Sequence, residues 1–169
     1  MSETHSVVPA PSQFAAITAY DNFEMIQKEH IFPSIYILKI LAAKMHEIFY
    51  SFTVAEKSIQ VHYPDGAFYF FLSFEDFKKE LSKKGIRSGE EMCQSLLNEA
   101  GVAMLPGSSF GRSADELTAR LSYVDFNGEE ALKLFQDPSQ FSEEKVLEVC
   151  SRCLTGAERI VEWLMKKVR

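Results

Sequence analysis

The sequence is poor in cysteine, in basic clusters and in long apolar runs, and each shortage narrows the class of protein. Only three of its 169 residues are cysteine, so one thiol stays unpaired in any scheme and no disulfide framework is expected. The net charge is −6, and lysine and arginine are spread along the chain. No apolar run approaches the ~18 residues of a membrane span, and the N-terminus lacks the basic-then-apolar layout of a signal peptide. We therefore expect a cytoplasmic protein without a nucleic-acid or membrane partner.

Most sequence motifs of catalysis are also missing. The four histidines show neither H-x-x-x-H nor H-E-x-x-H spacing, so no metal ligands are assigned. There is no G-x-S-x-G, no Walker loop and no G-x-G-x-x-G. Cys150 and Cys153 form a C-x-x-C, which could be a redox motif or half a zinc site. However, no second pair or nearby histidine would complete it, and the surrounding pattern is that of a helix interior, so we expect both residues in a helical core.

The composition is that of an ordinary globular protein. Apolar residues make up 46% of the chain and charged residues 25%, with 14 phenylalanines available for burial. The length suits a single domain spanning 1–169, with a helical arm at 1–52 and a sheet-and-helix body at 53–169. The fold class we expect is α/β (α+β), with a short mixed, largely antiparallel sheet packed with helices and preceded by a long N-terminal helix.

Apolar periodicity and turn residues locate the elements of the first half. A helix is expected at 9–20, and a long helical pattern over 22–52 is interrupted near 32 by Pro33. Strands at 59–63 and 67–72, joined by Pro64-Asp65-Gly66, form a candidate hairpin. Two capping boxes then open the next helices, which are expected as follows: Ser73 with Asp76 for 74–84, and Ser88 with Glu91 for 89–99.

The second half is expected to hold two more strands and two helices. The strands lie at 101–105 and 117–126 and are joined by the loop 106–116. A short helix follows at 129–136. A continuous helix then runs from an N-cap at Ser142 to 167.

Arg120 is an unusual residue within its strand. Strand alternation places it on one face with Thr118 and Ser122, and places Ala119 and Leu121 on the other. It could be an ordinary exposed arginine, or a planar fork of donors that grips a carboxylate through two parallel hydrogen bonds. The neighbouring stretch Gly107-Ser108-Ser109-Phe110-Gly111 has the composition of a phosphate loop but also fits a plain connection between strands.

Four segments together resemble a known family. These are "SETHSVVPAPSQFAAITAY", "PDGAFYFF", "GVAMLPGSSFG" and "LTARLSYVDFNGEEAL", in the order and spacing of the C-terminal third of class I/II (aspartate aminotransferase-like, fold type I) pyridoxal-phosphate-dependent aminotransferases. The resemblance implies a C-terminal small domain behind a long connecting helix. It also implies that Arg120 binds the carboxylate of an amino-acid or 2-oxo-acid substrate, and that Gly107 and Phe110 lie in a loop at the substrate entrance.

Several parts of the family's active site have no match in this sequence. The Schiff-base lysine, the phosphate-binding arginine and the partners of the cofactor ring are missing, and Lys39, Lys44 and Lys57 do not match the catalytic lysine. We therefore assign no catalytic and no cofactor-binding residue to this chain, and expect it to be inactive alone and not to bind pyridoxal phosphate covalently. The partners implied are the amino-acid or 2-oxo-acid substrate, a large cofactor domain absent from this chain, and a second copy in a homodimer.

Two alternatives remain open. The chain could be a stand-alone binding or interaction module without catalysis, or a fragment of a related pyridoxal-phosphate lyase or decarboxylase. The motifs do not separate the possible amino-acid substrates. Cut free of a larger domain, the apolar side chains Val7, Val8, Phe14 and Ile17 would be exposed and would favour self-association.

Overall fold

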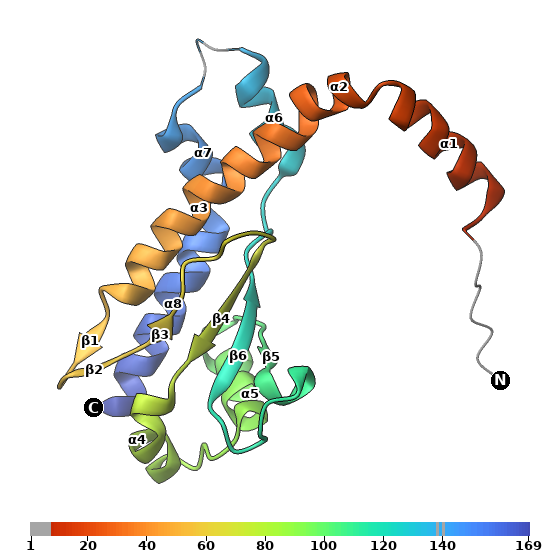
Figure 1. Ribbon diagram of the computed structural model, residues 1–169. Helices are drawn as coiled ribbons and strands as arrows, with labels where there is room; N and C mark the ends of the chain where they lie inside the picture. The colour runs from red at the N-terminus through yellow and green to blue at the C-terminus, as the bar shows by residue number, and fades with distance from the viewer. Residues whose placement is uncertain (1–7, 138, 140) are drawn as a thin grey trace. The chain divides into compact units, whose positions relative to one another are not determined.

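The computed structural model describes residues 8–137, 139 and 141–169 (Figure 1). The chain divides into two compact units, Met1–Tyr36 and Ile37–Arg169, and each is described by itself. The boundary falls inside a helix, where the first unit ends and the part of the chain that carries the sheet begins.

From Ala10 on, the first unit is helical apart from a turn at Asn22. Helix α1 spans Ala10–Asp21, α2 spans Phe23–Ile26, a π-helical turn η1 spans Gln27–Ile31, and α3 begins at Phe32. The expected interruption near residue 32 is confirmed, because the Phe32 N–H donates to the Gln27 carbonyl in the wider π pattern just before Pro33. No residue of α1 is buried.

The second unit is built on an antiparallel sheet. Its strands are β3 (Gln60–Val61), β4 (Tyr69–Ser73), β5 (Leu105–Pro106) and β6 (Thr118–Ser122), in the order β3-β4-β6-β5. A separate pair, β1 (Thr53–Val54) with β2 (Lys57–Ser58), precedes it. Every pairing is antiparallel, so the expected fold class of a small antiparallel sheet packed with helices is confirmed.

The helices of this unit are joined to the sheet through one hydrophobic core. They are α3 to Tyr50, α4 (Lys78–Lys83), α5 (Gly89–Ala100), α6 (Gly128–Gln136), α7 (Glu143–Val149) and α8 (Ser151–Val168), with 3-10 turns η2 (Glu75–Phe77) and η3 (Gly107–Phe110). Alternation along β4 and β6 sends Phe70, Leu72, Ala119 and Leu121 into the core. The core also takes side chains from all six of these helices: Leu41, Met45, Phe49, Leu81, Met92, Leu96, Ala131, Val146, Ala157, Ile160 and Leu164.

Helices α5 and α8 lie against each other and are tied by polar contacts (Figure 1). The Trp163 indole N–H donates to Ser95 Oγ over 3.2 Å, and Lys167 Nζ lies 2.7 Å from Glu99 Oε1. The indole is almost fully buried, so its one polar group needs this partner.

The serine cap of one expected capping box forms, although its Glu91 carboxylate accepts from the Arg87 N–H and not from that of Ser88, and the other box does not form. Ser88 Oγ accepts from the Glu91 N–H over 3.2 Å at the start of α5, as expected. At residues 73–76 a 3-10 turn comes first, and Ser73 Oγ accepts from the Glu75 N–H. The Asp76 carboxylate is instead used across the fold, where it accepts from the Ser58 N–H over 3.2 Å. The expected box of Ser73 with Asp76 was therefore wrong.

The strands are shorter than their apolar runs. The expected 101–105 strand reduces to Leu105–Pro106, and 117–126 to Thr118–Ser122, because a ladder needs a partner as well as a pattern. The expected hairpin forms between β3 and β4 with a connection wider than its Pro64-Asp65-Gly66 turn.

The long C-terminal helix expected from Ser142 is divided at Cys150. Ser142 Oγ does cap its start by accepting from the Lys145 N–H, as expected. At Cys150 the backbone leaves the α conformation, with φ −88° and ψ 10°, between α7 and α8. Cys150 and Cys153 are both buried free thiols, so they belong to the core, but the expected uninterrupted helix was wrong.

Two features are absent from the described part of the chain. None of its helices is both long enough and apolar enough to cross a membrane. Within the same residues, no group of three or more histidine, cysteine or acidic side chains is placed to hold a metal ion.

Candidate functional site

Arg120 lies in the middle of the sheet, on the face opposite the core. It is on β6, between Phe71 of β4 and Leu105 of β5, which are its partners in register. The neighbouring pairs Tyr69 with Ser122 and Ser73 with Thr118 share this face, as alternation predicts. Two flanking strands fix the backbone of Arg120, so its side chain starts from a rigid position.

The guanidinium of Arg120 is held by aromatic rings and not by an acid. Its Cζ lies 4.1 Å from the ring centre of Tyr69 and 4.2 Å from that of Phe110. No carboxylate pairs with it in the part of the chain that the structure describes. By contrast, Arg112 reaches Glu116 over 2.7 Å and Arg152 reaches Asp125 over 3.1 Å. The donors of Arg120 are thus free for an anionic ligand from outside this chain.

The loop after β5 brings Phe110 to this arginine. Pro106 ends the strand, the turn η3 follows, and Gly111 closes it in the left-handed conformation with φ 81°, which glycine adopts without strain. Gly107 is the buried first residue of this turn, and a Cβ on it would overlap Thr118 Oγ1. Of the two loop residues expected at the substrate entrance, Phe110 therefore lies at the guanidinium, while Gly107 packs against β6.

Apolar side chains surround the guanidinium on the open face of the sheet. Phe71, Leu105 and Phe110 keep 41%, 50% and 41% of their surface exposed, and the rings of Phe71 and Phe110 meet edge to face at 6.4 Å. Such neighbours lower the local dielectric and strengthen a charge-assisted hydrogen bond made there. We define these four residues, Phe71, Leu105, Phe110 and Tyr69, with Arg120 as the arginine site.

The sequence alone predicts only some residues of the arginine site. It singles out Arg120 and Phe110, whereas Tyr69 appears only as part of the family-like segment "PDGAFYFF". Phe71 and Leu105 were not singled out, although odd-numbered residues of 69–73 had to share one face of the strand. To identify the cross-strand partners of Arg120 one needs the register of the three strands, which cannot be read from the sequence.

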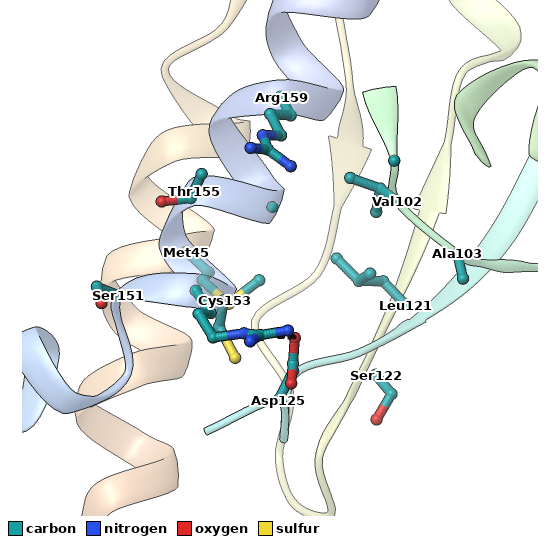
Figure 2. A pocket seen from close by; sticks show the side chains of 13 residues that line it. Met45, Val102, Ala103, Leu121, Ser122, Asp125, Ser151, Cys153, Thr155 and Arg159 are labelled. Carbon is teal, nitrogen blue, oxygen red and sulfur yellow. Dashed lines mark hydrogen bonds and ion pairs between the residues drawn. The ribbon is translucent and has the colours of Figure 1, made fainter. Parts of the chain in front are cut away.

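A separate hollow of about 520 Å³ is lined by α8, by residues 101–103 before β5 and by the end of β6 (Figure 2). Ser151, Thr155 and Arg159 line it from α8, and Figure 2 shows Arg159 extending from the helix toward the side on which Val102 lies. Arg120 does not line it. The one thiol in its lining is that of the buried Cys153, and burial raises the pKa of this thiol, so the thiolate needed for attack is disfavoured there.

Covalent chemistry with a carbonyl cofactor needs a neutral amine in a low-dielectric site, whereas five lysines of the described residues are paired with carboxylates. The hydrogen bonds that Lys78 and Lys133 donate to Asp115 and Glu129 raise the pKa values of these two amines. The paired lysines of the described residues are Lys44, Lys57, Lys78, Lys133 and Lys167. We assign no step of cofactor chemistry to this chain.

Comparison with known proteins places this arrangement in context. No family model matches the chain. An aspartate aminotransferase from Bacillus sp. (strain YM-2) is 33% identical over 113 residues, which is 67% of this chain and 25% of that enzyme. An aspartate aminotransferase from Sulfolobus acidocaldarius is 32% identical over 126 residues, covering 72% and 28%. Among solved structures, an aromatic aminotransferase from Pyrococcus horikoshii OT3 shares 21% identity with a TM-score of 0.43, covering 88% of this chain and 28% of that one.

These relatives agree on one class of protein, the aminotransferases. The chain belongs to the fold type I, aspartate aminotransferase-like family. It spans about a quarter of the length of the curated relatives that it matches.

Proposed function

We propose that the chain is the substrate-carboxylate-binding small domain of a pyridoxal-phosphate-dependent aminotransferase. In that enzyme an amino group passes from an amino acid to a 2-oxo acid, and Arg120 anchors the carboxylate that both substrates share. The observation that carries the proposal is the Arg120 guanidinium, which is fixed on a central strand, held by two rings and left without a carboxylate partner in the described residues.

The physical case rests on geometry and on charge. A guanidinium presents parallel N–H groups that match the two oxygens of a carboxylate, and hydrogen bonds to charged groups contribute about 1.5–3 kcal/mol each. Lysine carries the same charge without the fork, so it cannot reproduce the paired bonds. An anchor of this kind fixes one end of the substrate, which orients the bond to be broken.

The remaining parts of the proposal lie outside these residues. A larger domain would hold pyridoxal phosphate and supply the chemistry, and the isolated chain would show no turnover. A homodimer in the cytoplasm is proposed from the family and from the three free thiols, and the exposed Phe14 and Tyr20 of α1 offer apolar surface for association. Light scattering that reports a strict monomer at all concentrations would count against self-association through this surface.

The anchor is tested by titrating the ¹⁵N-labelled 169-residue chain with acetate and with uncharged acetamide. We expect acetate, and not acetamide, to shift the Arg120 Nε–Hε signal with a dissociation constant on the order of 1–10 mM, because two exposed charge-assisted bonds must offset the cost of association. Arg120→Lys should abolish the saturable shifts at Phe71 and Leu105.

The other arginines serve as internal controls. Arg112 and Arg152 already have carboxylate partners and should respond weakly. If the Arg120 signal moves no more than theirs, the anchor role is wrong.

Catalysis is tested in a chimera that carries this chain in place of the matching quarter of the Bacillus aspartate aminotransferase. We expect Arg120→Lys to lower kcat/KM by about 10–100-fold, which is the loss of one charge-assisted bond. A chimera that stays fully active with lysine at this position would rule out the proposed anchor in the enzyme.

A further inference from the structure

Two aromatic rings support the Arg120 guanidinium from different elements. Tyr69 belongs to β4 on one side of β6, and Phe110 to the turn that follows β5 on the other side. Each ring has an aromatic neighbour of its own, Phe68 at 4.4 Å for Tyr69 and Phe71 at 6.4 Å for Phe110. The guanidinium therefore lies between two separately held rings, and its accessible N–H groups are those along its edge.

We propose that Tyr69 and Phe110 are positioning residues that clamp Arg120 and restrict its ligand to a planar carboxylate, a role that rests on the proposed function of Arg120. A carboxylate can accept both edge N–H bonds while lying in the guanidinium plane. A tetrahedral oxyanion has oxygens above and below that plane, and with two ring centres 4.1 Å and 4.2 Å from Cζ we expect little room for them. The clamp thus discriminates by shape between anions of equal charge.

The position of Phe110 depends on a close approach between the loop and β6. Gly107 lies directly on Thr118, and a Cβ at residue 107 would overlap Thr118 Oγ1. Thr118 stands two residues before Arg120 on the same face of the sheet, so the turn that covers Thr118 also carries Phe110 over the guanidinium. Gly107 thereby acts on the site through Phe110 and not by touching a ligand.

The shape filter is tested on the 169-residue chain with acetate and methanesulfonate, two monoanions that share a methyl group. The ratio of their dissociation constants is read from the Arg120 Nε–Hε signal. We expect the wild type to favour acetate, and Phe110→Leu to reduce that preference by about 3–10-fold, because removing one ring opens one face of the guanidinium. Tyr69→Leu should act in the same direction.

Matched variants separate this role from general effects. Tyr50→Leu removes an exposed ring that does not contact Arg120, and it should leave the ratio unchanged. If Arg120 of the wild type does not bind acetate at all, the proposed function fails. If it binds acetate and Phe110→Leu keeps the wild-type ratio, the anchor stands and the clamp is wrong.

The close packing of the loop against β6 is tested by substituting Gly107. Gly107→Ala should reduce the acetate preference as Phe110→Leu does, and adding Thr118→Ala should restore most of it, because the overlapping oxygen is gone. The exposed Ser109→Ala is the control and should have no effect. Loss of preference that the double variant does not restore would overturn the coupling between Gly107 and Phe110.

Discussion

At the scale of single residues, two buried cysteines are expected to make the stability of the fold depend on alkaline pH. Burial raises the pKa of the Cys150 thiol to about 12, with a smaller contribution from Cys153, and it raises that of Cys93 to about 11, aided by the charge of Glu90. An unfolded chain would ionise these thiols near the ordinary value of 9.0. Below that pH both states keep the proton, and above it only the unfolded state loses it.

The fold should therefore lose stability as the pH rises above about 9. Each thiol adds a slope of up to about 1.4 kcal/mol per pH unit until its folded-state pKa is reached. Urea unfolding at pH 7, 9 and 10 measures this, and Cys150→Ala should show a flatter decline than the wild type. A free energy of unfolding that is constant or rising from pH 8 to 10 would contradict the prediction.

The residue scale also shows what the sequence reveals about the arginine site. Arg120 and Phe110 could be singled out because a charge in a strand and an aromatic in a glycine loop are locally unusual. Phe71 and Leu105 are ordinary strand residues, and only the register of three strands brings them beside Arg120. Local patterns thus found the charge but not its surroundings.

At the scale of elements, helix ends follow local chemistry closely. Ser88, Asn127 and Ser142 each accept a hydrogen bond from the N–H three residues on, at the starts of α5, α6 and α7. Gly101 ends α5 in the left-handed conformation with φ 68°. These contacts are short in sequence, which is why most helices could be located in advance.

Gly101→Ala should destabilise the protein by about 1 kcal/mol, since alanine pays a steric cost in the left-handed region. Gly128→Ala is the matched control. Its backbone is not left-handed and nothing lies within 4 Å of the added methyl, so we expect a change near zero. Chemical denaturation of both variants measures the difference. Equal losses at the two positions would show that the helix-ending conformation is not the cause.

Two features of the fold differ from what the sequence predicts, namely the turn between β1 and β2 and the break at Cys150. The turn between β1 and β2 places Ala55 and Glu56 at φ 50° and 63°, which residues other than glycine and asparagine rarely adopt. The break at Cys150 lies inside an uninterrupted apolar pattern. Tertiary packing overrides local preference at both places, so a single sequence does not reveal them.

At the scale of the whole molecule, burial is distributed very unevenly. No residue of α1 is buried, whereas α5, α8, β4 and β6 all contribute to one core. Amide hydrogen exchange in the whole chain should therefore be fast along Ala10–Asp21 and slowest in the central strands. Protection of α1 equal to that of β6 at low protein concentration would contradict this expectation.

The division into two units could not be read from composition. Contacts divide the chain after Tyr36, within α3, and the expected single domain with an arm to residue 52 stays a prediction. Apolar residues occur at helical spacing on both sides of that point. Whether such residues are buried depends on what packs against them, and the pattern alone does not say.

The π-helical turn at Gln27–Ile31 has a consequence for length variation in this arm. Such a turn holds one residue more than the α-helical turn it replaces, and each residue of an α-helix rotates the chain by about 100°. Deleting one residue here would let a regular α-helical turn form with nearly the same total rotation, so the side chains before Gln27 would keep their directions relative to those from Phe32 to Tyr36. Related chains that differ by one residue in this turn would thus present the same stripe of the arm.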